Sequence, residues 1–217
     1  MIGGSFGSLL PESARVLVIG AHADDIEIGC GGTLLRMVDE VPSLDVTWVV
    51  LSADGERGDE ARTGARAFVG GAQSSDVVIG SFQDGYLPYL GSAVKDFFED
   101  LARRVDPHLI LTHARADLHQ DHRLACELTW NTWRNHLVFE YEIPKYDGDL
   151  GTPNVFVTLT GAQLDRKIEL LMDIYATQRS KHWFTEDLLK ALPRVRGMEA
   201  RSASGLAEGF TCRKLSI

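Results

Sequence analysis

Residues 16–33 read V-L-V-I-G-A-H-A-D-D-I-E-I-G-C-G-G-T, in which an apolar run is followed by ionisable residues and then by several glycines. The stretch opens with the continuous apolar run V-L-V-I, which predicts a buried strand. His22, Asp24 and Asp25 follow after two small residues, and a glycine cluster and an amphipathic helical pattern come next. A strand that runs into polar residues and then into a helix is typical of an α/β sheet, which binds its ligands at the carboxyl ends of its strands.

Strands and helical patterns alternate along the rest of the chain, which predicts a mostly parallel sheet. We therefore expect residues 1–217 to form a single-domain, three-layer α/β/α Rossmann-like fold, with a loosely packed segment at 1–13. Right-handed crossovers place the first and fourth strands side by side. The expected strands are 15–21, 45–52, 77–79, 108–112, 138–143, 154–159 and 209–215, and the later helices are 94–105, 122–134, 164–175 and 185–192.

The composition is that of a globular protein, with 217 residues, of which 44% are apolar and 24% charged. The net charge of −9 argues against a nucleic-acid or anionic membrane surface as partner. Cys30, Cys126 and Cys212 are scattered, which indicates neither a disulfide framework nor a cysteine-rich metal site. The first thirteen residues show no secretory signal pattern and no apolar run is long enough to span a bilayer, so we expect a cytoplasmic protein.

A second polar loop follows the fourth expected strand and reads T-H-A-R-A-D-L-H-Q-D-H-R over residues 112–123. Since the two loops follow neighbouring strands, their histidines and carboxylates should meet at one edge of the sheet. His22, Asp25 and His122 would then supply two imidazoles and one carboxylate to a metal ion, with a further position left for water. Asp24 would remain free to accept a proton, and His119 would face the site from the other side.

Other interpretations of the same residues stay open at this point. Asp24 or Asp25 can simply cap the following helix, and His113, directly after its strand, is expected to be structural. The glycine cluster suggests a dinucleotide-binding oxidoreductase, although it lacks the spacing G-x-G-x-x-G and two carboxylates would repel a pyrophosphate. Two histidines and one carboxylate also suit an iron(II) oxygenase. A non-catalytic sugar-binding protein is a further alternative.

The motifs A-H-A-D-D at 21–25 and H-x-D-H at 119–122 resemble those of the PIG-L or LmbE-like family of zinc-dependent N-deacetylases. Ala23 stands where that family usually has proline. The similarity extends to D-G-E-R-G, F-Q-D-G and Y-E-I-P-K-Y-D-G-D-L-G. The resemblance implies Zn²⁺ as cofactor, with Fe²⁺ as an alternative in the same site, and assigns the following roles: ligands His22, Asp25 and His122; general base Asp24; acid His119; and Asp121 as the partner that orients a histidine.

The resemblance further implies a hydrolase that removes an N-acetyl group from an amino sugar, free or carried on a glycoside or nucleotide. We expect Arg62 and Asp84, in loops after the second and third strands, to contact that substrate. The alternatives are an amidase acting on a sugar or thiol conjugate and a sugar-binding protein without catalysis. The expected partner is this small molecule, not nucleic acid or a membrane, and a homo-oligomer is compatible with the sequence.

Overall fold

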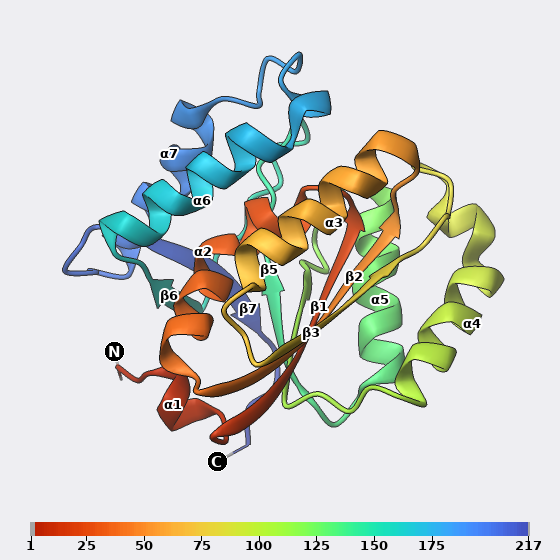
Figure 1. Cartoon of the computed structure of the whole chain (residues 1–217), viewed down its shortest axis with the longest axis horizontal. Coiled ribbons are helices and arrows are strands. Elements are labelled where there is room, and N and C mark those ends of the chain that lie inside the picture. Colours follow the sequence, from red (N-terminus) through yellow and green to blue (C-terminus); the bar gives the residue numbers. More distant parts are fainter. Residues whose placement is uncertain (1–2, 217) are drawn as a thin grey trace.

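A seven-stranded sheet with the order β3-β2-β1-β4-β5-β7-β6 runs through the molecule. The structure is a computed structural model and describes residues 3–216. β7 runs antiparallel to both of its neighbours, and the pairs among β1 to β5 are parallel, so the predicted mostly parallel sheet is confirmed (Figure 1). The strands are β1 (Ser13–His22), β2 (Ser43–Ser52), β3 (Ser74–Ile79), β4 (Leu109–His113), β5 (Leu137–Tyr141), β6 (Val155–Thr158) and β7 (Ala207–Cys212).

Helices cover both faces of this sheet, which confirms the three-layer arrangement (Figure 1). α2, α3 and α6 pack on one face, and α4 and α5 pack on the other. α7 packs beside α6 and against β7. The helices are α1 (Phe6–Leu9), α2 (Asp25–Glu40), α3 (Gly55–Val69), α4 (Gly91–Ala102), α5 (Gln120–Thr132), α6 (Gly161–Ile174) and α7 (Glu186–Glu199), with short 3₁₀ turns η1 (Leu87–Leu90) and η2 (Ala176–Gln178).

β1 is buried on both sides, which explains its unbroken apolar sequence. Val16 and Val18 contribute to the core under α2, α3 and α6, whereas Leu17 and Ile19 contribute to the core under α4 and α5. Successive side chains of a strand point to opposite faces, so a strand covered twice needs apolar residues at every position. This requirement is what made the central strand recognisable in the sequence.

β1 lies between β2 and β4, and the strand order reverses at this point. The chain moves outward in one direction through β2 and β3, and in the other direction through β4 and β5. The predicted pairing of the first and fourth strands is confirmed, with Val16 opposite Leu109 and Val18 opposite Leu111. Such a switch point opens a crevice at the carboxyl ends of the two strands. His22 and His113 are the last residues of β1 and β4.

The N-terminal segment, predicted to be loosely packed over residues 1–13, places two of its apolar side chains in the core. Met1 and Ile2 lie outside the described residues, but Phe6 and Leu10 are buried in the core. The backbone N–H of Phe6 donates to Glu40 of α2 at 2.9 Å. Phe6 therefore attaches this segment to α2, through its ring against Arg36 and its backbone bond to Glu40. The prediction of loose packing followed from the many glycine and serine residues of the segment and gave no weight to Phe6 and Leu10.

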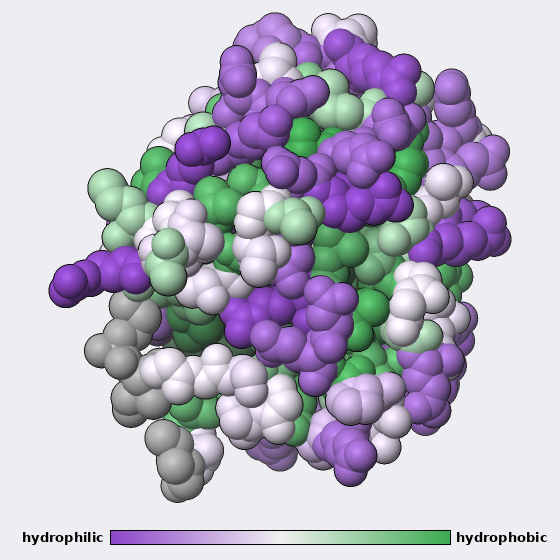
Figure 2. Space-filling model, turned by 60° about the vertical axis from the view of Figure 1, so that its left-hand side comes forward, coloured by the Kyte–Doolittle hydropathy of each residue, from purple (hydrophilic) through white to green (hydrophobic). Residues whose placement is uncertain are grey.

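Figure 2 shows the side on which α1, α6 and α7 lie, where hydrophilic residues cover much of the face and apolar residues show between them. α7 extends past Pro193 to Glu199, beyond the predicted end at residue 192. Between residues 3 and 216, no helix combines the length and the apolar composition that crossing a membrane requires.

Candidate metal centre

The first part of the site lies where β1 passes into α2. His22 ends β1 and Asp25 begins α2, and the backbone N–H of His22 donates to Asp25 Oδ2 at 2.7 Å. Asp24, between them, has a left-handed backbone with φ of 92°. This conformation is uncommon for a residue other than glycine and occurs often at functional sites. The turn thus presents one imidazole and two carboxylates at the carboxyl end of β1.

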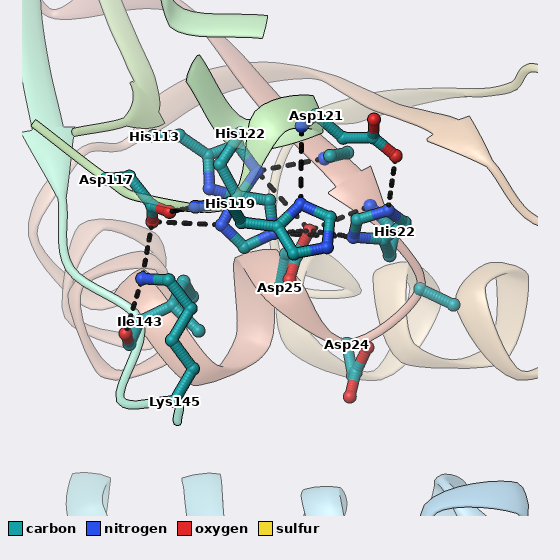
Figure 3. Close-up of polar contacts among 12 residues, drawn as sticks. His22, Asp24, Asp25, His113, Asp117, His119, Asp121, His122, Ile143 and Lys145 are labelled. Atoms are coloured by element: carbon teal, nitrogen blue, oxygen red, sulfur yellow. Dashed lines mark hydrogen bonds and ion pairs between the residues drawn. The ribbon is translucent and has the colours of Figure 1, made fainter. Parts of the chain in front are cut away.

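The second part comes from the loop after β4 and the first turn of α5. His119 is the N-cap of α5, and its Nδ1 accepts the backbone N–H of Asp121 at 3.3 Å. Asp121 and His122 follow in the first turn of the helix and are both buried. The switch point brings this turn to the end of β1, so side chains about a hundred positions apart in sequence meet here (Figure 3).

Three donor atoms of the predicted ligands form a nearly equilateral triangle. His22 Nδ1 lies 3.3 Å from Asp25 Oδ2 and 3.3 Å from His122 Nε2, and His122 Nε2 lies 3.4 Å from Asp25 Oδ2. Ligands at about 2.0–2.1 Å from a tetrahedral zinc ion are separated by about 3.3–3.4 Å. The triangle therefore has the dimensions of one face of such a coordination sphere, and these residues fit a divalent cation.

The second ring nitrogen of each of these histidines is held by a carboxylate. His22 Nε2 lies 3.0 Å from Asp121 Oδ2, and His122 Nδ1 lies 2.9 Å from Asp117 Oδ2. Metal-binding histidines are usually oriented in this way, because the carboxylate fixes the tautomer and makes the facing nitrogen more basic. Asp121 thus contacts His22, and its orienting role stays a prediction.

Two further histidines lie against the triangle, but hydrogen bonds already use one ring nitrogen of each. His113 Nε2 accepts the backbone N–H of Ala21 at 2.9 Å, and its ring stacks on that of His122 with centroids 3.9 Å apart. The bond from Asp121 occupies His119 Nδ1, so the neutral ring of His119 carries its proton on Nε2. His119 is only half-buried, and its ring centroid lies 5.0 Å from that of His22. His113 therefore supports the site, and His119 remains available to a substrate.

Opposite charges balance one another at the centre of the site. Burial lowers the pKa of His122, but the charges of Asp25 and Asp117 outweigh burial and raise that pKa to about 9. Burial alone would raise the pKa of Asp25, whereas His122 and His113 hold it well below its ordinary value. Burial lowers the pKa of His113 to about 4, and the charge of His122 acts in the same direction. Without a metal, a proton on His122 compensates Asp25; a bound cation would take over that role.

Asp24 differs from Asp25 in its surroundings. Burial and then the charge of Asp25 raise the pKa of Asp24 well above its ordinary value, and Arg57 opposes this shift. Arg57 Nη2 contacts Asp24 Oδ1 at 3.3 Å and donates to the carbonyl of Ala23 at 3.1 Å. In Figure 3, Asp24 lies next to Asp25 without a drawn contact to the histidines. A carboxyl with a raised pKa beside a cation site suits a proton acceptor.

The two residues predicted to contact the substrate are placed differently. Asp84 lies at the site: its Oδ1 is 3.0 Å from His22 Nε2, its Oδ2 is 3.2 Å from Arg57, and its side chain is 55% exposed. The hydrogen bond from His22 lowers the pKa of Asp84 to about 2. Arg62 is exposed on α3 and has no side-chain hydrogen bond or ion pair to any residue in the described range 3–216. Its assigned role stays a prediction, and Arg57 occupies the place expected for it.

Three residues outside the sequence-based assignment also belong to the site. Arg57 contacts Asp24 and Asp84, Asp117 holds His122, and Lys145 contacts Asp117 at 2.9 Å. Asp117 stands in the same polar loop as His122, and this proximity is a signal that sequence analysis could have used. Lys145 follows β5, and no spacing in the sequence connects it with the other two.

The glycine cluster of α2 has a packing role. A Cβ on Gly29 would overlap the ring of Tyr141, and one on Gly31 would overlap Phe68. The cluster therefore lets α2 lie very close to β5 and α3, which keeps Asp25 at its place beside His122. This close packing, rather than a phosphate cradle, accounts for the small residues, so the observation gives no support to a dinucleotide-binding protein.

A comparison with known families gives a match for the part of the chain that contains both polar loops. The family described as PIG-L, GlcNAc-PI de-N-acetylase, matches residues 17–133, which is more than half of the 217 residues. The matched region includes His22, Asp25 and His122.

Solved structures resemble the chain over nearly its whole length. The 4-carboxy-2-hydroxymuconate hydratase GalB from Pseudomonas putida KT2440 has a TM-score of 0.75 at 19% identity, over 94% of this chain and 98% of its own. N,N'-diacetylchitobiose deacetylase from Pyrococcus horikoshii has a TM-score of 0.67 at 16% identity, with coverages of 95% and 89%. The zinc-inhibited form of the teicoplanin deacetylase Orf2 has a TM-score of 0.70 at 15% identity, with coverages of 93% and 100%. At these identities the likeness establishes the fold.

Proposed function

Because the chain belongs to the PIG-L family of GlcNAc-PI de-N-acetylases, we propose that it is a metal-dependent hydrolase that removes an N-acetyl group from an amino sugar. The observation that carries this proposal is the triangle of donor atoms from His22, Asp25 and His122, with edges of 3.3 to 3.4 Å. Three protein ligands are the number that catalytic zinc sites use, since the fourth position is kept for water or substrate.

Zn²⁺ is the ion we propose, with Fe²⁺ as the alternative for the same donors. Two imidazoles and one carboxylate form a common hydrolytic zinc site, and the carboxylates behind both histidines favour tight binding. When bound, the ion would polarise the amide carbonyl and lower the pKa of a water molecule. The remaining chemistry belongs to the side chains around it.

Asp24 and His119 are the proposed catalytic side chains beside the ligands. Asp24 is buried, and burial and then the charge of Asp25 raise its pKa, which makes its carboxylate a stronger acceptor for the proton of the attacking water. Its neighbour Arg57 fixes the orientation of the carboxylate. His119 lies against the rings of His22 and His122, and its Nε2–H can donate a hydrogen bond to the oxyanion that develops on the substrate. The proton that Asp24 accepted from water then passes to the leaving nitrogen of the amide. The products are acetate and a free amine.

An N-acetylated amino sugar is the proposed substrate, free or as part of a small glycoside or nucleotide. Asp84 and Arg57 form an ion pair at the exposed side of the site, where a carboxylate and a guanidinium can hydrogen-bond to sugar hydroxyls. Two of the structural neighbours are named as deacetylases of diacetylchitobiose and teicoplanin. We further propose a cytoplasmic location, because all three cysteines are free and two of them are buried.

A substrate panel tests the reaction and the substrate together. We expect the zinc-loaded protein to release amine from N-acetylglucosamine or from its glycoside or nucleotide-linked forms, and not from acetyl-lysine peptides. The assay measures free amine and acetate in parallel. Preference for the peptides would contradict the sugar assignment. Since GalB shares the fold and is a hydratase, 4-carboxy-2-hydroxymuconate is included, and consumption of it without release of amine from any amide would contradict the deacetylase proposal.

A further inference from the structure

Lys145 lies outside both metal-binding loops but contacts the carboxylate that holds a proposed ligand. Its Nζ is 2.9 Å from Asp117 Oδ2, the same oxygen that lies 2.9 Å from His122 Nδ1 (Figure 3). The side chain of Lys145 is 13% exposed and that of Asp117 is 2% exposed. Removing one partner of an ion pair this poorly exposed to water costs more than breaking a surface ion pair, because the remaining charge is left buried.

Asp117 connects the two functional histidines of the second loop. Its Oδ1 accepts the backbone N–H of His119 at 2.8 Å, while Oδ2 contacts the ring of His122. The orientation of this one carboxylate therefore sets the position of His119 and of a proposed ligand at the same time. A residue that holds Asp117 in place therefore affects the positions of both His119 and His122.

The segment that carries Lys145 is itself fastened on both sides. Asp149 contacts Lys145 Nζ at 2.6 Å and accepts the backbone N–H of Leu118 at 2.6 Å. At the ends of the segment, Glu142 accepts from Arg196 of α7 at 2.7 Å and from the backbone N–H of Gly151 at 3.1 Å. Residues 142–151 are thus attached to α7 and to the loop before α5, and Lys145 has a defined position.

Lys145 supplies the charge that compensates the carboxylate of Asp117. Among the described residues, it is the lysine or arginine whose side chain contacts that carboxylate, whereas Arg123 donates to the backbone carbonyl of Asp117 at 3.3 Å. Leaving a nearly buried carboxylate uncompensated is costly. Loss of the Lys145 charge should therefore disturb the position of Asp117 behind His122.

We propose that Lys145 is a positioning residue of the metal centre, which holds Asp117 so that His122 presents Nε2 to the ion. The inference rests on the proposed metal site. It predicts that the charge of Lys145 contributes to metal affinity, although Lys145 touches neither the ion nor the substrate. Loss of a partner behind a ligand typically weakens metal binding by about 10- to 100-fold.

The test is the zinc dissociation constant, measured by competition with a chelator and therefore independent of turnover. Lys145→Gln keeps a hydrogen-bond donor but removes the charge, and Lys145→Met removes both; we expect each to weaken zinc binding by about 10- to 100-fold. Lys145→Arg restores the charge and should bring the constant to within about 3-fold of the original. Lys190→Met, which removes an exposed lysine paired with Glu186 on α7, is the matched control and should leave the constant unchanged.

A fifth variant, Asp149→Asn, separates the charge of Lys145 from the anchoring of its segment. Asp149→Asn weakens the attachment of residues 142–151 but leaves Lys145 and Asp117 charged, so we expect less than about 3-fold loss of zinc affinity. An equal loss in Asp149→Asn and Lys145→Gln would overturn the role of the Lys145 charge. Unchanged affinity in either folded Lys145 variant, Gln or Met, would overturn it as well. Absence of zinc binding in the parent protein would overturn the metal site itself.

Discussion

Asp24 and Asp25 are adjacent carboxylates with different surroundings, and this difference defines their roles. Asp25 lies 3.3 to 3.4 Å from His22 and His122, whereas Asp24 contacts Arg57 at 3.3 Å. We therefore expect Asp24→Asn to retain zinc but to lower kcat by about 10²–10⁴-fold, because the amide cannot accept the water proton. Elemental analysis and steady-state kinetics on the same preparation measure both quantities. Asp59→Asn, at an exposed position of α3, is the control and should behave like the parent protein.

Arg57 and Arg62 both lie on α3, but their side chains have different surroundings. They are five positions apart on α3, which separates them by about 140° around the helix. Since Arg57 contacts Asp24 and Asp84, we expect Arg57→Met to lower kcat/KM by about 10-fold or more, in keeping with a hydrogen bond to a charged group. Arg62→Met should have a much smaller effect. If Arg62→Met alone raised KM, the sequence-based assignment of Arg62 would hold instead.

At the scale of elements, the central strands and the two polar loops could be predicted because local sequence determines them. β1 reads as a buried strand from its own apolar run, and the right-handed crossover rule then places β4 beside it. The residues His22, Asp25 and His122 follow from those two placements. Nothing in this reasoning needs the later part of the chain.

Contacts that depend on side-chain direction could not be predicted in the same way. Choosing between Arg57 and Arg62 requires the rotation of α3 about its axis, whereas the sequence analysis placed Arg62 in a loop after the second strand. Lys145 reaches Asp117 because residues 142–151 fold back across the site, a path set by the contacts of Asp149 and Arg196. The antiparallel direction of β7 is likewise defined by its pairing with β5 and β6, which are distant in sequence, and not by its own residues.

Because α2 lies very close to β5, the position of Gly29 in α2 should not accept a larger side chain. Alanine normally stabilises a helix relative to glycine by about 1 kcal/mol, but a Cβ on Gly29 would overlap Tyr141, whose hydroxyl is fixed by a 2.6 Å bond to the carbonyl of Ile19. We expect overpacking to prevail, so that Gly29→Ala loses about 1–3 kcal/mol of stability and several degrees in Tm.

Gly91→Ala serves as the control for this prediction. Gly91 begins α4 with nothing within 4 Å of an added Cβ, so the substitution tests the intrinsic effect of alanine without overlap. Calorimetry of both variants should show a lower Tm for Gly29→Ala and an unchanged or slightly higher Tm for Gly91→Ala. A Gly29→Ala protein as stable as its parent would mean that the packing of α2 is looser than its glycines indicate.

For the whole molecule, the charges of the metal centre should make the free energy of unfolding decrease as pH rises. Bound zinc should remove this decrease. Burial lowers the pKa of His122, but Asp25 and Asp117 prevail and raise it to about 9 in the metal-free protein. An unfolded histidine titrates near about 6.5. Between these values the folded state holds a proton that the unfolded state has lost, so stability falls as pH rises, by about 1.4 kcal/mol per pH unit for each such proton.

Zinc should remove this dependence, because a metal-bound His122 is neutral and carries no extra proton into the folded state. We expect the Tm measured with a chelator to fall between pH 7 and 8.5, and the Tm measured with zinc to change much less over the same range. Groups away from the site, such as the buried thiol of Cys30, act equally on both forms and cancel in the difference. His122→Asn should reduce the slope of the metal-free protein. A metal-free Tm that stays constant or rises over this range would contradict the proton held at His122.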